Sequence, residues 1–218
     1  VSGPAGTGKT HFACEHAIEK LAANDINRIV ITRPIVSVDN EEMGFLPGTI
    51  NSKMAPWTRP IFDLFSEYYD TRQIERMVAD NVIEISPIAY MRGRTFKKCS
   101  VIADEMQNST PTQMKMLLTR LGEGSRMVIT GDPQQTDLKD QQNGFSDFLG
   151  KYRSFSKRRN PVTNIDLVSL TQQDIVRSEV VKSVIDIYDF DDRKEPKFSS
   201  DKVKFAIDQL MKHNSSSV

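Results

Sequence analysis

The sequence predicts an α/β fold, a three-layer sandwich in which a mostly parallel β-sheet carries helices on both faces. The first observation is an alternation of short runs rich in Ile and Val with longer segments at helical spacing along the 218 residues. The second is that glycine-rich and acidic segments directly follow several of the apolar runs. In parallel sheets the carboxyl ends of the strands lie at one edge, so these segments are expected to meet there.

Short apolar runs with β-branched residues predict buried strands at residues 28–32, 82–86, 100–104, 126–130 and 165–170. Apolar residues at helical spacing predict helices at residues 11–23, 57–69, 72–79, 111–121, 143–151 and 174–188. The helix at 111–121 has a clear start, because Pro111 follows Thr110 at the first helical position. Glycine, proline and short polar residues predict a long loop at 36–53, and residues 87–98 predict another loop.

The polar residues 191–197 predict a linker. We therefore expect one domain over residues 1–190, followed over residues 191–218 by the linker, a weak amphipathic helix at 202–213 and a tail. Val1 is already the last strand position before a glycine-rich loop, and it is not Met. We therefore expect the chain to be a fragment of a longer protein.

The composition narrows the class of protein. The 29 basic residues balance the 29 acidic ones, so any surface for nucleic acid must be local. Cys14 and Cys99 lie in apolar contexts without metal-ligand spacing, which predicts reduced core thiols. No apolar run approaches membrane-spanning length and no signal peptide is visible. We therefore expect a cytoplasmic protein with no membrane partner.

The first ten residues contain a complete G-x-x-x-x-G-K-T phosphate loop before an apolar helical segment. Its glycines allow backbone N–H groups to converge on a phosphate, and the helix N-terminus adds its positive dipole end. Lys9 can reach the β- and γ-phosphates, and the Thr10 hydroxyl can ligate Mg²⁺. A chance glycine-rich turn does not explain a full-length match in this context. The predicted nucleotide-binding residues are Gly3, Pro4, Ala5, Gly6, Thr7, Gly8, Lys9, Thr10 and His11.

Two acidic residues, Asp104 and Glu105, end the predicted strand at 100–104. Asp104 can hold Mg²⁺ together with Thr10, directly or through water. Glu105 is then the natural general base for the water that attacks the γ-phosphate. Paired acids also end strands as solvated turns, but the phosphate loop favours the functional interpretation.

The motifs Asp-Glu-x-Gln at 104–107 and Gly-Asp-x-x-Gln at 131–135, each after its own strand, resemble the ATPase half of superfamily-one helicases. In that group the glutamine that matches Gln135 senses the γ-phosphate and couples it to the nucleic-acid site. Residues 32–34 match the segment that contacts the single strand. Residues 2–10, 32–34, 92–95, 104–108 and 131–138 also resemble the PhoH-like family, and the similarity covers residues 1–188.

The resemblance implies a P-loop NTPase domain of the RecA or helicase type over residues 1–190. It implies an ATPase that uses ATP and Mg²⁺, with Lys9, Glu105 and Gln135 as catalytic residues and Thr10 and Asp104 as metal ligands. It further implies a helicase-like or translocase enzyme that acts on RNA or single-stranded DNA and tends to form ring-like oligomers.

Superfamily-one helicases take an arginine finger from a second fold, for which this chain is too short. An arginine finger contributes about 10³–10⁵ in rate, so we expect a homo-oligomeric ring in which a neighbouring copy supplies it. Arg177 is the first candidate, and Arg92 and Arg94 are rivals. Arg177 can equally be a surface residue paired with Asp174 or Glu179.

Residues 151–159 carry five basic residues interleaved with Tyr152 and Phe155. This pattern suits single-strand binding, and a solvated loop explains it as well. Two other functions stay open. A small-molecule kinase would transfer phosphate to a metabolite and be indifferent to polynucleotide. A non-hydrolysing assembly module would use ATP only to lock a ring, which the acidic pair argues against.

Overall fold

The computed structural model describes residues 1–34, 50–138, 142–158, 164–176 and 179–189. Its contacts divide the chain into two units, Val1–Val176 and Arg177–Val218. Helix α6 (Glu179–Asp189) belongs to the second unit and is considered by itself. The predicted helix at 202–213, Arg177 and most of the predicted loop at 36–53 lie outside the described residues. The domain boundary after residue 190 stays a prediction.

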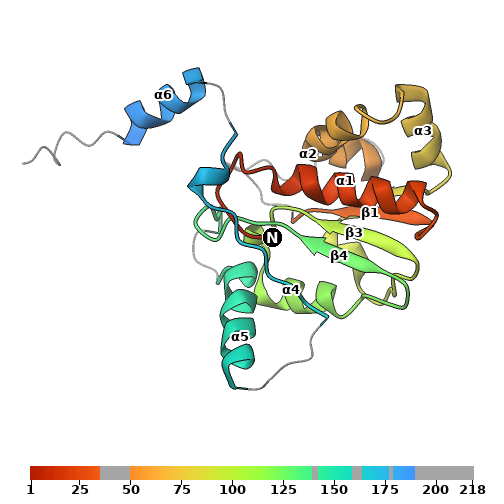
Figure 1. Cartoon of the computed structure of the whole chain (residues 1–218). Coiled ribbons are helices and arrows are strands. Elements are labelled where there is room, and N and C mark those ends of the chain that lie inside the picture. The colour runs from red at the N-terminus through yellow and green to blue at the C-terminus, as the bar shows by residue number, and fades with distance from the viewer. Residues whose placement is uncertain (35–49, 139–141, 159–163, 177–178, 190–218) are drawn as a thin grey trace, which may run out of the picture. The chain divides into compact units, whose positions relative to one another are not determined.

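The first unit is built on a parallel sheet of β2 (Ile83–Ile85), β1 (Arg28–Thr32), β3 (Cys99–Ala103) and β4 (Arg126–Ile129), in that spatial order (Figure 1). Each neighbouring pair is parallel, with Val30 opposite Val101 in the central pair. Burial is complete along β3, as expected for a strand covered on both faces. The predicted α/β fold is therefore confirmed.

Helices cover both faces of the sheet, as Figure 1 shows. On one face lie α1 (Lys9–Ala22), α2 (Ile50–Phe65) and α3 (Thr71–Ala79). On the other lie α4 (Pro111–Leu118) and α5 (Gly144–Arg158). None of the helices in the described ranges is long and apolar enough to span a lipid bilayer.

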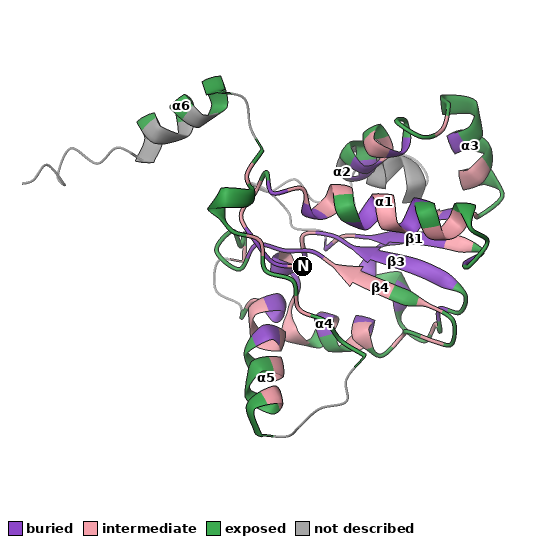
Figure 2. Cartoon of the chain, in the orientation of Figure 1, coloured by how far each residue is buried: buried purple, intermediate pink, exposed green. Residues whose placement is uncertain are grey.

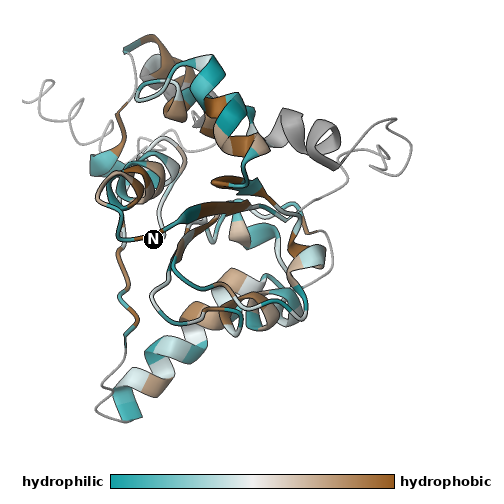
Figure 3. Ribbon diagram, turned by 90° about the vertical axis from the view of Figure 1, so that its right-hand side faces the viewer, coloured by the Kyte–Doolittle hydropathy of each residue, from teal (hydrophilic) through white to brown (hydrophobic). Residues whose placement is uncertain are grey.

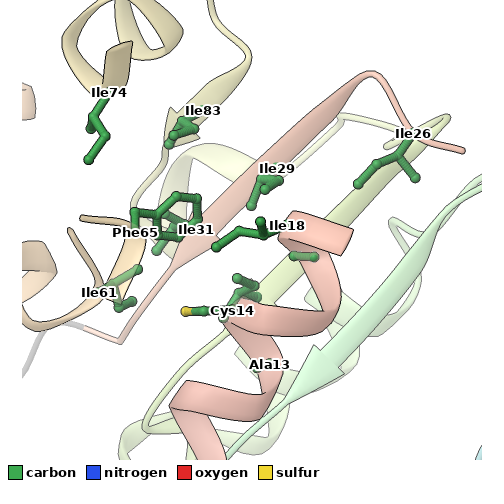
Figure 4. Close-up of a cluster of buried hydrophobic side chains, with 12 residues drawn as sticks. Ala13, Cys14, Ile18, Ile26, Ile29, Ile31, Ile61, Phe65, Ile74 and Ile83 are labelled. Atoms are coloured by element: carbon green, nitrogen blue, oxygen red, sulfur yellow. The ribbon is translucent and has the colours of Figure 1, made fainter. Parts of the chain in front are cut away.

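Alternate residues of β1, β3 and β4 contribute to two separate cores. In β1, Ile29 and Ile31 pack with α1 and α2, around Ile18 and Phe65 (Figure 4), whereas Val30 belongs to the core under α4 and α5. In Figure 2, β1 and β3 accordingly lie almost wholly buried between the two helical layers, whereas β4 is mostly half-buried. The sheet carries strongly hydrophobic residues in Figure 3.

Both cysteines are free and buried, as predicted. Burial, with a contribution from the nearby Asp104 carboxylate, raises the pKa of the Cys14 thiol to about 12. The Cys14 side chain is therefore an uncharged group of the core between α1 and the sheet, and not a nucleophile.

Helix α4 starts as predicted, with Pro111 in the first turn and Thr110 as its N-cap. The Thr110 hydroxyl accepts a hydrogen bond from the Gln113 N–H, and the Gln113 side chain accepts one from the Thr110 N–H. This capping box pairs two N–H groups that a helix start otherwise leaves without partners.

The prediction of a loop after residue 151 is wrong, because α5 continues to Arg158. Its apolar face extends beyond the predicted end, where the Tyr152 ring lies 6.4 Å from that of Phe148 and the Tyr152 hydroxyl donates to the Ile165 carbonyl. Tertiary packing here outweighs the polar composition that suggested a loop.

Other predicted boundaries also change, and α4 ends at Leu118, three residues before its predicted end. The predicted strand at 165–170 is reduced to a single parallel bridge, between Ser169 and Ser2. Helix α2 begins at Ile50, within the predicted loop. The predicted helix at 174–188 is interrupted, because a 3₁₀ turn at Gln172–Asp174, capped by the Thr171 side chain, precedes α6.

Candidate nucleotide site

The phosphate loop joins Ser2 to α1 at the carboxyl edge of the sheet. Ser2 forms parallel bridges with both Gly131 and Ser169, so the loop emerges beside the end of β4. Gly6 and Gly8 have φ values of 80° and 79°, in the left-handed region that glycine adopts without strain. These positions explain two of the motif's glycines by backbone geometry.

A third glycine is required by packing. A Cβ atom at Gly3 would come within 2.8 Å of both the Cβ and the carbonyl oxygen of Leu170. The segment after residue 164 therefore closes one side of the loop. Substitution of Gly3 would force the two segments apart.

Lys9 is buried against the loop, although its side chain is cationic. Its Nζ donates hydrogen bonds of 2.8 Å to the carbonyl oxygens of Gly3 and Pro4. The Thr7 hydroxyl also donates to the Pro4 carbonyl, at 2.8 Å. These bonds hold the loop in a curved shape and keep the ammonium group paired inside it.

Asp104, the residue after β3, connects the end of that strand to the phosphate loop. The Thr10 hydroxyl donates to its Oδ1 at 2.7 Å, and the Thr130 hydroxyl donates to the same atom at 2.5 Å. Asp104 is 4% exposed, and both hydroxyls bind one of its two carboxylate oxygens. A buried carboxylate beside a hydroxyl is an oxygen-donor set that suits Mg²⁺.

The described residues contain no cluster of three or more His, Cys, Asp or Glu side chains that could hold a metal ion by themselves. Thr10 and Asp104 therefore fit a Mg²⁺ ion whose other ligands are phosphate oxygens and water, the usual arrangement at a phosphate loop.

Glu105 follows β3 with an unusual backbone, φ 54° and ψ 39°. This left-handed conformation costs a non-glycine residue about 1–2 kcal/mol, and such strain is concentrated at functional sites. The Glu105 carboxylate accepts a hydrogen bond from the side-chain amide of Gln107. The structure thus places Glu105 beside Asp104 with a defined side-chain partner.

The loop after β4 contains Asp132, which is 6% exposed, and Gln135, which is exposed. The Gln135 N–H donates to the Asp132 carbonyl, so the two residues form one turn. The Asp132 N–H donates to the side chain of Gln107 at 3.1 Å. The sequence indicated Gln107 only as part of a motif and did not indicate Thr130. The signal for Thr130 was a hydroxyl at the end of a buried strand, level with the acidic pair.

The candidate arginines differ in their surroundings, and Arg94 has partners within the chain. Arg94 donates to Glu84 through both of its terminal nitrogens, and its guanidinium lies 4.8 Å from the centre of the Phe96 ring. Arg28 binds the same carboxylate at 2.9 Å. The hydrogen bonds from Arg94 hold the pKa of Glu84 below its usual range. Arg94 is therefore held in an ion pair within the same chain.

The other predicted residues have simpler surroundings. Arg92 is exposed, and Arg177 lies outside the described residues. His11 is half-buried on α1, with its ring edge-on to that of Phe12 at 5.9 Å. The basic residues 151–158 lie on α5, at its C-terminal end.

Comparison with known proteins shows which family the chain belongs to. The family model for PhoH-like protein matches residues 1–189. The chain is 43% identical over 187 residues to the PhoH-like protein of Bacillus subtilis, covering 86% of this chain and 56% of the relative. It is 40% identical over 194 residues to the PhoH-like protein of Synechocystis, covering 89% and 57%.

Protein PhoH of Escherichia coli K12 is 38% identical over 190 residues, covering 86% of this chain and 51% of the relative. The chain thus spans about half the length of the curated relatives that it matches. The chain belongs to the PhoH-like protein family, a family of P-loop NTPases, and this membership implies that it binds a nucleotide.

Proposed function

We propose that the chain hydrolyses ATP with Mg²⁺ and that single-stranded nucleic acid stimulates this activity. The observation that carries the hydrolysis is the 2.7 Å hydrogen bond between the Thr10 hydroxyl and the Asp104 carboxylate. It brings the end of the phosphate loop to the acidic end of β3, where Glu105 follows.

Each residue of the site has its own role in the proposed hydrolysis of ATP. The loop N–H groups and Lys9 bind the β- and γ-phosphates, with the Lys9 ammonium exchanging two loop carbonyls for phosphate oxygens. Thr10 and Asp104 hold Mg²⁺, which when bound neutralises charge on the phosphates. Glu105 accepts the proton of the attacking water, since it is the carboxylate next to the metal ligand.

Helix α5 supports the nucleic-acid part of the proposal. Lys151, Phe155 and Arg158 are spaced i, i+4 and i+7, so they share one face of the helix, and Phe155 is 49% exposed. They line a hollow of about 870 Å³, in which Gly150 contributes no side chain. Cations for phosphates and a ring for bases are the features of a single-strand surface.

The same helix touches the nucleotide side of the domain. The Gly144 N–H donates to the Ser109 carbonyl at 2.7 Å, four residues after Glu105. A Cβ at Gly131 would come within 2.9 Å of the Phe145 ring. Movement of α5 on binding a strand would therefore reach both segments that surround the acidic pair.

The proposal is tested by measuring phosphate release from ATP with Mg²⁺ or with excess chelator, each with and without poly-U or single-stranded DNA. We expect hydrolysis that needs Mg²⁺ and rises with polynucleotide. Phosphate that appears on a small-molecule acceptor would favour the kinase alternative. Bound ATP that stays intact over a single turnover would favour the assembly module.

The α5 surface has its own test. Phe155→Ala and Arg158→Gln should raise the polynucleotide concentration for half-maximal stimulation by about 10-fold, because stacking is worth about 1–3 kcal/mol per base. Arg72→Gln, at an exposed basic residue of α3 on the other face of the sheet, is the matched control. An equal effect of all three substitutions would reject this surface.

A further inference from the structure

One side-chain amide joins two parts of the site. The Oε1 atom of Gln107 accepts the Asp132 N–H at 3.1 Å, and its Nε2 donates to the Glu105 carboxylate. Gln107 is 2% exposed, so its bond to the Asp132 N–H is shielded from bulk water, whereas the Glu105 carboxylate is half-buried. The Gln107 amide therefore binds the Glu105 carboxylate through its nitrogen and the loop after β4 through its oxygen.

The orientation of this amide is set by chemistry. The Asp132 N–H can only donate and the Glu105 carboxylate accepts, so the reversed amide would face donor to donor and oxygen to oxygen. The fit is also close. A Cβ at Gly131 would lie 3.0 Å from the Gln107 Oε1 atom and 2.9 Å from the Phe145 ring. The absence of a side chain at Gly131 therefore leaves the space in which the Gln107 amide lies.

The far side of the loop is bound to the same short segment. The Thr136 hydroxyl donates to the Gln107 carbonyl at 3.1 Å. Asn108 and Asp137 exchange two hydrogen bonds, from the Asp137 N–H at 2.8 Å and from the Asn108 amide at 3.0 Å. The exposed residues between these anchors include Gln135, so a ligand that moves Gln135 pulls on Gln107.

We propose that Gln107 is a positioning residue. It holds the Glu105 carboxylate in place and makes the position of that carboxylate depend on the loop after β4. This role rests on the proposed function of Glu105 as the base. The strained backbone at Glu105 adds to the argument, since a residue in this conformation keeps its geometry only when its surroundings hold it. A base displaced by about 1 Å loses about 10²-fold in rate, so a small movement of the loop is enough to change turnover.

Two substitutions separate the ends of the amide. Gln107→Glu keeps an acceptor for the Asp132 N–H and removes the donor to Glu105, whereas Gln107→Met removes both. Both should lower the single-turnover rate of ATP hydrolysis by about 10-fold or more, while the Kd for a fluorescent ATP analogue changes by less than about 2-fold. The matched control is Gln113→Met, which removes an amide that caps α4. This control should lower the melting temperature and leave the rate unchanged.

The decisive measurement repeats Gln107→Glu in a Glu105→Gln background, with enzyme in excess over ATP. If Gln107 acts through Glu105, the second substitution causes no further loss of rate. A loss by the same factor in both backgrounds would overturn the proposal, as would weaker ATP binding with an unchanged rate. Normal turnover of the Glu105→Gln protein itself would remove the base and this role together. A slow Glu105→Gln protein beside a normal Gln107→Glu protein would remove the positioning role alone.

Discussion

Thr10 and Asp104 are 94 positions apart in the sequence, yet the hydroxyl of one donates to the carboxylate of the other at 2.7 Å. The bond connects the first turn of α1 to the residue that follows β3. It also places two oxygen donors side by side at the end of the phosphate loop, where Mg²⁺ with its phosphate ligands is expected. The proposed activity depends on this meeting of two segments.

Removal of the Thr10 hydroxyl should weaken Mg²⁺ use. We expect Thr10→Val to raise the Mg²⁺ concentration for half-maximal ATP hydrolysis by about 10-fold or more, because one ligand is lost and Asp104 loses a hydrogen-bond partner. Thr10→Ser keeps the hydroxyl and serves as the control. An identical Mg²⁺ requirement of the two variants would show that the hydroxyl holds no metal.

Loss of the Gln135 side chain should act on stimulation more than on basal turnover. Gln135 is exposed on the loop that Gln107 and Asn108 anchor. For Gln135→Ala we expect a basal rate within about 2-fold of the unmodified protein and a markedly smaller increase on adding poly-U. Gln134→Ala is the control at the neighbouring exposed position. Equal losses of basal and stimulated rates would make Gln135 an ordinary active-site residue.

The Glu84 ion pairs should contribute stability that depends on pH. The pKa of Glu84 is lowered, chiefly by hydrogen bonds from Arg94, relative to its usual 4.5. Its stabilisation is therefore fully present above pH 4.5 and is lost as the pH falls through the lower folded-state pKa. Glu84→Gln should cost about 1 kcal/mol at pH 7 and reduce the slope of melting temperature against pH below 4.5. An unchanged slope would show that the ion pairs do not stabilise the fold.

The proposed arginine in trans predicts activity that depends on assembly. Specific activity should rise with protein concentration, because a finger from a neighbouring copy contributes about 10³–10⁵ in rate. A mixture of inactive Arg177→Ala and Lys9→Ala proteins should regain activity, since mixed boundaries can combine an intact loop with an intact finger. Regained activity with an inactive Arg92→Ala protein but not with Arg177→Ala would move the finger to Arg92. Full activity of a demonstrated monomer would contradict the arrangement.

The parts of the fold that could be predicted are those set by local patterns. Strand β1 lies at the predicted residues, because an apolar β-branched run bounded by polar residues has few alternatives to a buried strand. The start of α4 was also predictable, since Pro111 and the Thr110 cap act within one turn. The end of α5 was not, because it depends on contacts of Tyr152 with a distant segment.

In the candidate site, too, local motifs were predictable and tertiary contacts were not. The phosphate loop and the acidic pair are contiguous motifs, so residue types and spacing indicated them. The bonds of Gln107 with Asp132 and of Thr130 with Asp104 could not be predicted, because each spans about 25 positions and depends on the pairing of β3 with β4. The ion pair of Arg94 with Glu84 could not be predicted either, because it depends on the position of β2 in the sheet.

The central claim, that Glu105 activates water at this site, is tested most directly by single-turnover hydrolysis in the Glu105→Gln protein. The account predicts that this variant binds a fluorescent ATP analogue with the Kd of the unmodified protein. It also predicts that bound ATP is cleaved at least about 10²-fold more slowly, because a base contributes about 10²–10⁴ in rate. Cleavage of bound ATP at the unmodified rate would contradict the claim.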